Sequence, residues 1–584
     1  MSASSLSPSL SKSGGATPAE PKERRASWVK LAERLQGCLS TLEWVTVVIV
    51  TLVAIALHVR FVTHVGGLWR DEANSVQLST LPTITGIWHN LDYDSFPILF
   101  FVLLRAWTSI FGADNDTSLR LLGLIIGLST LGVLFLNART FRAHLPVLSI
   151  ALIGLNPMLI RYGDSSRAYG LGMILLLLTF RSFWRLADTS TPLTYRKVLL
   201  ATMLAVLSVQ CLYYNSILLF AIGSGSIVVA CLGRDWRRVG IVISIGILSA
   251  VSLLPYVPMM RRMREWTFLV SYPVDLLWLW RRACEVLGSP DPISQWIWVA
   301  LFVGGAGLVF GWIILHWRQV GEEEKGKSIA PIVYATMTAV VAVPSYAVFL
   351  RALGYYTQPW YYVTLAITVA FTLDVVFGAW PSTITSLQLS LRTVRLFAAF
   401  ALLSLATLPA WDEMPTRHTN VDLVAAKLKS QATKGDLVVT THWQYAVSLY
   451  RYYHGPARVI TLPFVEDHRF HRYDLALKQM QSDYPLEPAF TQIGQTLQSG
   501  HRVFFLGALR FSRAGELPPG LSLGYRDANG SRHGGNYDVV WPISAGYFVQ
   551  THAKNCVQIP VPVPNRARVQ RYEYLALSMA EGWR

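Results

Sequence analysis

The sequence has little charge and few cysteines for its length. Only 15% of its 584 residues are Asp, Glu, Lys or Arg, and 52% are hydrophobic, whereas a soluble domain carries roughly 25% charged residues. The five cysteines include no Cys-x-x-Cys pair, so neither a zinc site nor a disulfide framework is indicated. Because soluble domains divide well before this length, one oversized core does not explain the composition. A cytosolic enzyme and a secreted disulfide scaffold are therefore excluded.

Long apolar runs recur along most of the chain and predict a polytopic α-helical membrane protein. We distinguish twelve of them, at 44–62, 96–111, 118–137, 146–160, 169–184, 197–213, 216–232, 239–257, 295–315, 329–349, 359–377 and 393–409. The run 96–111 has 16 residues, about 24 Å of helix against a bilayer core of about 30 Å. It also contains Pro97 and Arg105. We therefore expect it to lie at the membrane surface, which leaves about eleven transmembrane helices.

The charges of the loops predict the orientation. The net charge is +16, and most basic residues stand in short loops between apolar runs, so the positive-inside bias explains the excess and no nucleic-acid partner is expected. With eleven spans the N-terminus is cytoplasmic and the C-terminus extracytoplasmic. Four outer segments result, at 64–117, 161–168, 258–294 and from about 410 onward, with a short turn near 355–359 beside them.

Three regions are expected. Residues 1–40 read as a disordered cytoplasmic tail without a signal-peptide core. Residues 41–410 form the transmembrane module, whose outer loop 64–117 carries an acidic motif. Residues 411–584 alternate helical stretches (420–431, 487–498) with the β-rich runs DLVVTT, ARVITL, HRVFFLG and YDVVW, which predicts a small extracytoplasmic α/β domain. This tail lacks a nucleotide-binding glycine motif, and we interpret it as a cap or acceptor-binding domain.

The segment GGLWRDEANSVQLS follows the first span and places Asp71 and Glu72 at the outer surface. Acids near lipid are costly unless they have a partner or a function; alternatively, they supply negative charge to the start of an interfacial helix. NPMLIRYGDSSRAYG lies on the same face, with Arg161, Tyr162, Asp164, Arg167 and Tyr169. Its arginines either close the turn by pairing with Asp164 or bind an anionic ligand.

Two further outer segments carry candidate ligand-binding residues. PYVPMMRRMREW contains Arg261, Arg262 and Arg264, which either contact lipid headgroups or bind the phosphate of a lipid-linked substrate. GYYTQPWYY contains Gln358 and Trp360, in an aromatic belt or a sugar-stacking surface. An acid, several cations and aromatic rings on one face are what an enzyme needs to move a sugar from a lipid phosphate to a hydroxyl.

These motifs resemble those of GT-C glycosyltransferases, in particular glycosyltransferase family 39, with its protein O-mannosyltransferases and bacterial aminoarabinose transferases. The resemblance rests on RDEANS, DSFPILFFVLLRAWTSIFG, SLRLLGLIIG, RYGDSSRAYGLG and TQPWYY, and covers roughly the first 370 residues. Relatives often carry a Glu at the position of Ser165, so the second acidic role, for which Asp164 is the candidate, departs from the family pattern.

The resemblance implies a polyprenyl-phosphate-linked monosaccharide donor, inverting transfer and a periplasmic or otherwise extracytoplasmic site. A bacterial inner membrane is expected, and an organellar membrane with a lumenal site is the alternative. It implies Asp71 as catalytic base, with Glu72 and Asp164 as further acids of the site. The residues expected to bind the donor phosphate or substrate are Arg70, Arg161, Tyr162, Arg167, Tyr169, Arg261, Arg262, Arg264, Gln358 and Trp360. No obligatory metal or cofactor is expected, although some family members hold a divalent metal. The acceptor, a hydroxyl or another polar group of a glycan, lipid or protein, is not readable from the sequence.

Two other functions remain open at this stage. A transporter or flippase for lipid-linked glycans would bind its cargo with the same outer charges, but it would place charged residues near mid-membrane. A ligase for preassembled glycans would share the basic outer loops without needing the RDE element after the first span.

Overall fold

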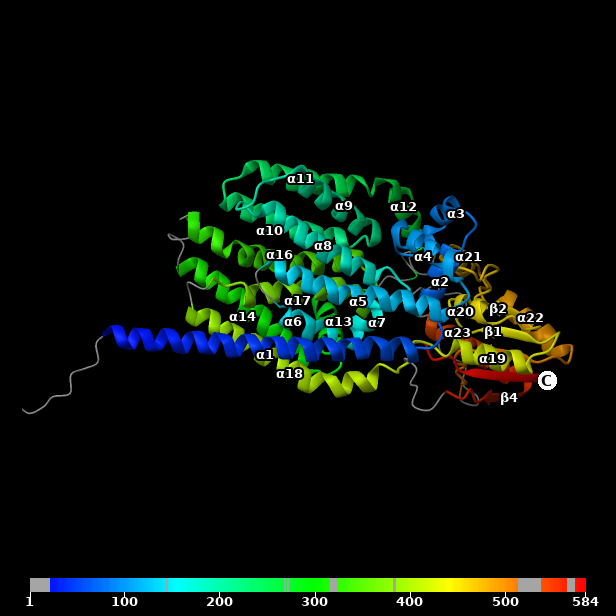
Figure 1. Cartoon of the computed structure of the whole chain (residues 1–584). Coiled ribbons are helices and arrows are strands. Elements are labelled where there is room, and N and C mark those ends of the chain that lie inside the picture. Colours follow the sequence, from blue (N-terminus) through cyan, green and yellow to red (C-terminus); the bar gives the residue numbers. More distant parts are fainter. Residues whose placement is uncertain are drawn as a thin grey trace, which may run out of the picture.

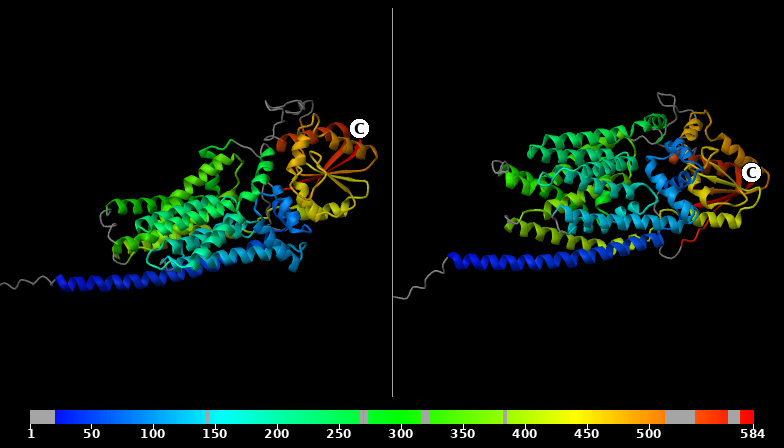
Figure 2. Two further views of the ribbon diagram at one scale, coloured as in Figure 1. Left: turned by 90° about the horizontal axis from the view of Figure 1, so that it is seen from above. Right: turned by 45° about the horizontal axis from the view of Figure 1, so that its top comes forward.

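The computed structural model describes residues 21–141, 145–266, 269, 273–315, 323–381, 385–512, 537–563 and 573–584. Long helices form a bundle, and a small α/β domain sits at one end of it (Figures 1 and 2). Short helices from the segment after the first span lie between the bundle and the domain. The predicted architecture, a helical membrane protein with a C-terminal α/β domain, is confirmed.

Nine helical segments in the described part of the chain are long and apolar enough to cross a membrane. They contain α1 (Pro21–His64), α5 (Asp116–Thr140), α8 (Tyr169–Ala187), α10 (Asn215–Leu232), α11 (Trp236–Val251) continued by η2 (Leu254–Tyr256) and α12 (Val257–Glu265), α14 (Ile293–Leu315), α16 (Glu323–Leu353), η4 (Pro359–Tyr362) with α17 (Val363–Gly378), and α18 (Thr385–Glu413). Large apolar side chains on their outer faces, such as Leu52, Phe220 and Phe397, are exposed. Such faces are stable in lipid, so the chain is a multi-pass membrane protein.

Two of the eleven predicted spans, 146–160 and 197–213, are not among these nine segments. The run 146–160 forms α6 (Val147–Gly154) and α7 (Pro157–Gly163), because Pro157 lacks the N–H that would continue the first helix. The side-chain oxygen of Asn156 accepts a hydrogen bond from the Leu159 amide at 3.1 Å and so caps α7. The run 197–213 forms α9 (Tyr195–Cys211), with 17 residues.

Helix α1 begins at Pro21, inside the segment expected to be a disordered tail. Residues 21–40 are rich in Ala, Leu, Arg, Lys and Glu, which are strong helix formers, and the first span therefore extends toward the N-terminus. Residues 1–20 lie outside the described residues.

The short run 96–111 forms the 14-residue helix α4 (Ile98–Phe111), as predicted, and not a span. It packs on α2 (Arg70–Ser79). The guanidinium of Arg105 donates hydrogen bonds to the carbonyls of Leu81 and Pro82, the latter at 2.8 Å. Arg105, which is unfavourable in a transmembrane helix, thus fixes the chain after α2. In the sequence, α3 (Ile84–His89) and η1 (Leu91–Tyr93) lie between α2 and α4.

The C-terminal domain contains a five-stranded sheet in the order β2-β1-β3-β5-β4. The strands are β1 (Leu437–Thr440), β2 (Arg458–Thr461), β3 (Val503–Leu506), β4 (Ala553–Ile559) and β5 (Leu577–Trp583). β1 pairs parallel with β2 and β3, whereas β5 is antiparallel to both β3 and β4. Around the sheet are α19 (Val421–Gln431), α20 (Tyr445–Tyr452), α21 (Tyr473–Met480), α22 (Glu487–Gln498) and α23 (Tyr537–His552).

The sequence predicted three of these strands and both helical stretches, but its fourth strand is wrong. YDVVW opens helix α23. This five-residue run and the 11 residues after it form one helix of 16 residues. A segment of that length favours a helix over a strand. The strands that the sequence did not predict are β4 and β5, most of whose residues are exposed or only partly buried.

Ion pairs and hydrogen bonds attach the domain to the juxtamembrane helices. Arg451 contacts Asp116 at 2.6 Å, and the hydroxyl of Tyr452 donates to the same carboxylate at 2.5 Å. The amide of Gln77 in α2 donates to the carbonyl of Val447 at 2.9 Å. These contacts hold α20 directly against α2, so the first residues of α2 are enclosed between the bundle and the domain.

Candidate active site

Helix α2 begins with the acidic motif, and its two acids have different surroundings. Asp71 and Glu72 occupy the first turn, where the positive end of the helix dipole stabilises negative charge. Glu72 is fully buried, whereas the Asp71 side chain is 19% exposed. Helix-dipole stabilisation therefore applies to both, but only Asp71 is accessible from solvent.

Every oxygen of Glu72 is occupied by the protein itself. Arg120 of α5 donates to Oε1 at 2.5 Å and to Oε2 at 3.0 Å. The Ser166 amide donates to Oε1 at 2.9 Å, and the Trp69 amide to Oε2 at 3.3 Å. The guanidinium and the two backbone amides thus satisfy the buried carboxylate on both oxygens. Glu72 therefore joins α2, α5 and the loop after α7, and has no oxygen left for a substrate.

Asp71 lies among three cationic or basic groups. Arg70 Nε is 3.6 Å and His471 Nε2 is 3.4 Å from its Oδ1, and Arg167 donates to its backbone carbonyl at 3.0 Å. Burial opposes the charge of Asp71, but the His471 imidazole and the guanidinium groups of Arg167 and Arg70 outweigh it and hold the pKa of Asp71 well below its usual range. Asp71 is thus an ionised, partly accessible carboxylate.

Arg167 connects the loop after α7 to α2 and to the segment before α4. It donates to Asp94 Oδ2 and to the Ser75 hydroxyl, both at 2.7 Å. Its guanidinium carbon lies 4.3 Å from the centre of the Phe96 ring. Arg167 is 5% exposed, so it positions the α2 backbone at Asp71 rather than presenting a free guanidinium to a ligand. Tyr169 packs edge-on against the same Phe96 ring.

Asp164 is directed away from Asp71 and toward α1. Its Oδ2 lies 2.7 Å from Nδ1 of His58, and both side chains are buried. Gly127 of α5 adjoins the other carboxylate oxygen, where a β-carbon would lie only 1.9 Å away. The arginines of this segment therefore pair with Asp94 and Glu413 rather than with Asp164.

Arg161 and Tyr162 face the end of α18 and an aromatic cluster. Arg161 is buried and lies 3.7 Å from Glu413. The Tyr162 ring lies 5.4 Å from Trp360, which in turn lies 5.3 Å from Trp69, just before Asp71. Trp360 belongs to η4, and Gln358 precedes it as the N-cap residue. The predicted aromatic residues thus do pack beside the start of α2.

The basic residues of α12 lie at the rim of the same end of the bundle (Figure 1). Arg262 contacts Asp92 at 3.0 Å, two residues before the Asp94 that binds Arg167. Arg261 and Arg264 are exposed. α12 therefore offers cationic side chains close to the juxtamembrane segment that supports Asp71.

Sequence reasoning missed the contribution of the C-terminal domain. His471 reaches Asp71, and Glu573 lies 3.9 Å from Arg70. Burial raises the pKa of Glu573 to about 7, with Arg70 acting in the opposite direction. Asp94 was also missed, although it lies in the quoted DSFPILFF element. The His in FHRYD and the Glu in RYEYL belong to no recognisable motif. Their role depends on contacts with residues about 400 and about 500 positions earlier in the sequence.

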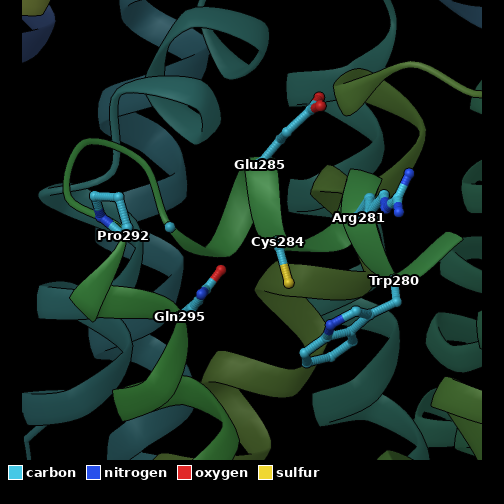
Figure 3. Close-up of a pocket in the computed structure, with 7 residues that line it drawn as sticks. Trp280, Arg281, Cys284, Glu285, Pro292 and Gln295 are labelled. Carbon is cyan, nitrogen blue, oxygen red and sulfur yellow. The ribbon is translucent and has the colours of Figure 1, made fainter. Parts of the chain in front are cut away.

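A separate hollow lies between α13 (Leu276–Leu287) and α14. Trp280, Cys284 and Gln295 are among its lining residues, and Glu285 points away from Gln295 (Figure 3). None of the residues around Asp71 lines it. Over the described ranges, no cluster of three His, Cys, Asp or Glu side chains is arranged to bind a metal ion.

No family model and no curated protein sequence matches this chain. Several solved structures, however, are similar to this chain. ArnT from Cupriavidus metallidurans bound to undecaprenyl phosphate is 11% identical, with a TM-score of 0.49, and the match covers 79% of this chain and 92% of ArnT. The apo form of the Archaeoglobus fulgidus oligosaccharyltransferase is 10% identical, with a TM-score of 0.47, over 80% of this chain and 69% of that protein. The same oligosaccharyltransferase in complex with Zn and sulfate matches at 13% identity and a TM-score of 0.44, over 79% and 67% of the two chains.

All of these TM-scores lie below 0.5. The likeness is one of helix arrangement, and the chemistry of the site rests on the residues of this chain.

Proposed function

We propose that the chain is an integral-membrane glycosyltransferase. It would move a monosaccharide from a polyprenyl-phosphate donor to an acceptor hydroxyl at the extracytoplasmic face of the inner membrane, with inversion of the anomeric centre. The observation that carries the proposal is Asp71: an accessible, ionised carboxylate at the start of a juxtamembrane helix, enclosed between the bundle and the domain and surrounded by cations.

The chemistry follows from these groups. The acceptor oxygen attacks the anomeric carbon while the bond from that carbon to the phosphate oxygen breaks, and the polyprenyl phosphate leaves with the electron pair. Asp71 takes the acceptor proton as the new bond forms. Arg70 is 22% exposed and has only long ion-pair contacts, at 3.6 and 3.9 Å, so it can stabilise the charge that develops on the phosphate. The bilayer holds the lipid tail and orients the donor.

Transfer by the purified protein in lipid tests this function. Radiolabelled polyprenyl-phosphate monosaccharides are supplied with a membrane extract as acceptor, and both released polyprenyl phosphate and labelled product are measured. Coupled appearance of the two is expected. Movement of an intact donor across the bilayer without release of polyprenyl phosphate would replace the proposal by a transporter, and transfer of preassembled glycans alone would replace it by a ligase.

The exposed arginines of α12 are proposed to attract the donor phosphate. Arg261→Glu and Arg264→Glu are each expected to raise the KM for the donor about tenfold with little change in kcat, because a charged hydrogen bond contributes about 1.5–3 kcal/mol. Initial rates over a range of donor concentrations measure this. The matched control is Arg196→Glu, an exposed arginine at the start of α9. An unchanged donor KM in both α12 variants would assign these arginines to lipid headgroups.

A further inference from the structure

His471 approaches the proposed base from the C-terminal domain. Its backbone amide donates to Oδ1 of Asn74 at 3.0 Å, and its ring lies edge-on to Trp443. The imidazole is therefore fixed from two sides, with Nε2 3.4 Å from Asp71 Oδ1. Neither Nδ1 nor Nε2 has a hydrogen-bond partner besides this contact of Nε2 with Asp71. An imidazole held in this way restricts the rotamers of the carboxylate beside it.

Glu573 approaches from the same domain on the other side of Arg70. Its side chain is completely buried, and neither carboxylate oxygen has a hydrogen-bond partner. The nearest cation is Arg70, whose Nη1 lies 3.9 Å away and whose Nε lies 3.6 Å from Asp71. A buried carboxyl group without hydrogen bonds is costly to maintain, which points to a role for it at this position. Arg70 is thus shared between two acids, one from the bundle side and one from the domain.

We propose that the C-terminal domain completes the active site by positioning Asp71, directly through His471 and indirectly through Glu573 and Arg70. The inference rests on the proposed function and adds two positioning residues to it. His471 holds Oδ1 of Asp71 and leaves the second oxygen for the acceptor hydroxyl. Glu573 determines how much of the Arg70 charge is available to Asp71.

The role of Glu573 has a consequence for pH dependence. Charged or titratable groups face this cluster from α2 (Arg70, Asp71), from the loop after α7 (Arg167) and from the domain (Tyr445, His471, Tyr473). Burial raises the pKa of Glu573 itself to about 7. When it loses its proton, Arg70 is shared and a second negative charge stands near Asp71, so Asp71 becomes a stronger base. Transfer is therefore expected to accelerate as the pH rises through about 7.

Substitutions of His471 separate a hydrogen-bonding role from packing. Phe retains an aromatic ring against Trp443 but cannot donate, whereas Gln keeps an N–H donor. We expect His471→Phe to lower kcat at least tenfold with an unchanged donor KM, and His471→Gln to recover much of the rate. In an Asp71→Asn background the Phe substitution should cost nothing further. His454→Phe, at an exposed histidine of the same domain, is the control. A better rate in the Phe than in the Gln variant, or additive losses in the double variant, would overturn the assignment of His471.

The Glu573 contribution is tested by its pH profile. Glu573→Gln is expected to lose the rise in kcat near pH 7, while Glu466→Gln, at an exposed glutamate of the domain, retains it. An identical profile in Glu573→Gln and the unsubstituted protein would remove Glu573 from the proposal.

Thermal unfolding distinguishes failure of this inference from failure of the proposed function. Asp71→Asn, His471→Phe and the double variant are compared by Tm without any substrate. Non-additive shifts support the Asp71–His471 pairing even for a protein that transfers no sugar. Additive shifts overturn the pairing even where the transfer assay succeeds.

Discussion

Asp71→Asn is expected to lower the rate of sugar transfer by about 10²- to 10⁴-fold, the usual contribution of a general base. The amide has the shape of the carboxylate but cannot take the acceptor proton. Because Arg70 and the α12 arginines remain, donor binding should change little, and the loss should appear in kcat. Released polyprenyl phosphate and labelled product are measured as a function of donor concentration.

Asp114→Asn is the matched control for this experiment. Asp114 is exposed and lies in the same juxtamembrane region, before α5. Its substitution is expected to leave the transfer rate unchanged. Near-normal turnover by the Asp71→Asn protein would exclude Asp71 as the base, and an equal loss in both variants would indicate a general effect of charge at this face.

Breaking the Glu72–Arg120 pair is expected to have the largest effect on stability. Both side chains are buried, with 0% and 3% exposed, and each single substitution leaves an uncompensated charge at a cost of about 3–5 kcal/mol. We therefore expect Glu72→Gln and Arg120→Gln each to lower the Tm markedly in detergent. Unfolding monitored by intrinsic tryptophan fluorescence measures this.

The double variant, Glu72→Gln with Arg120→Gln, provides the internal control. Because it leaves no unpaired buried charge, it should be less destabilised than the two single variants added together. Additive losses would show that the two side chains act independently. Single variants with an unchanged Tm would contradict the role of the pair in joining α2 to α5.

The sequence predicted the elements better than the contacts. Apolar periodicity located the spans and three strands because burial in lipid or in a sheet is a local property of the chain. It misplaced the fourth strand at Tyr537, where a run of β-branched residues is also compatible with a buried helix. The break in the run 146–160 at Asn156 was visible only as a proline, whose effect on a span depends on whether neighbouring groups satisfy the freed backbone.

The candidate site shows the same division. The RDE element was identified by its position directly after a span. The loop after α7 was identified by its charged residues. Sequence alone could not separate the roles of Asp71, Glu72 and Asp164, because these depend on which side chain meets Arg120, His58 or His471. Those partners lie tens to hundreds of residues away, and only the packed structure brings them within hydrogen-bonding distance.

The order of the strands has a consequence for biosynthesis. β5 is the last strand to be made, yet it lies between β3 and β4 and pairs with both. Glu573 precedes it by only a few residues. The strand that joins β4 to the rest of the sheet is therefore synthesised long after helix α2 and the spans. The surroundings of Asp71 described above are therefore complete only after residue 583, at the end of β5, has been made and β5 has paired with β3 and β4.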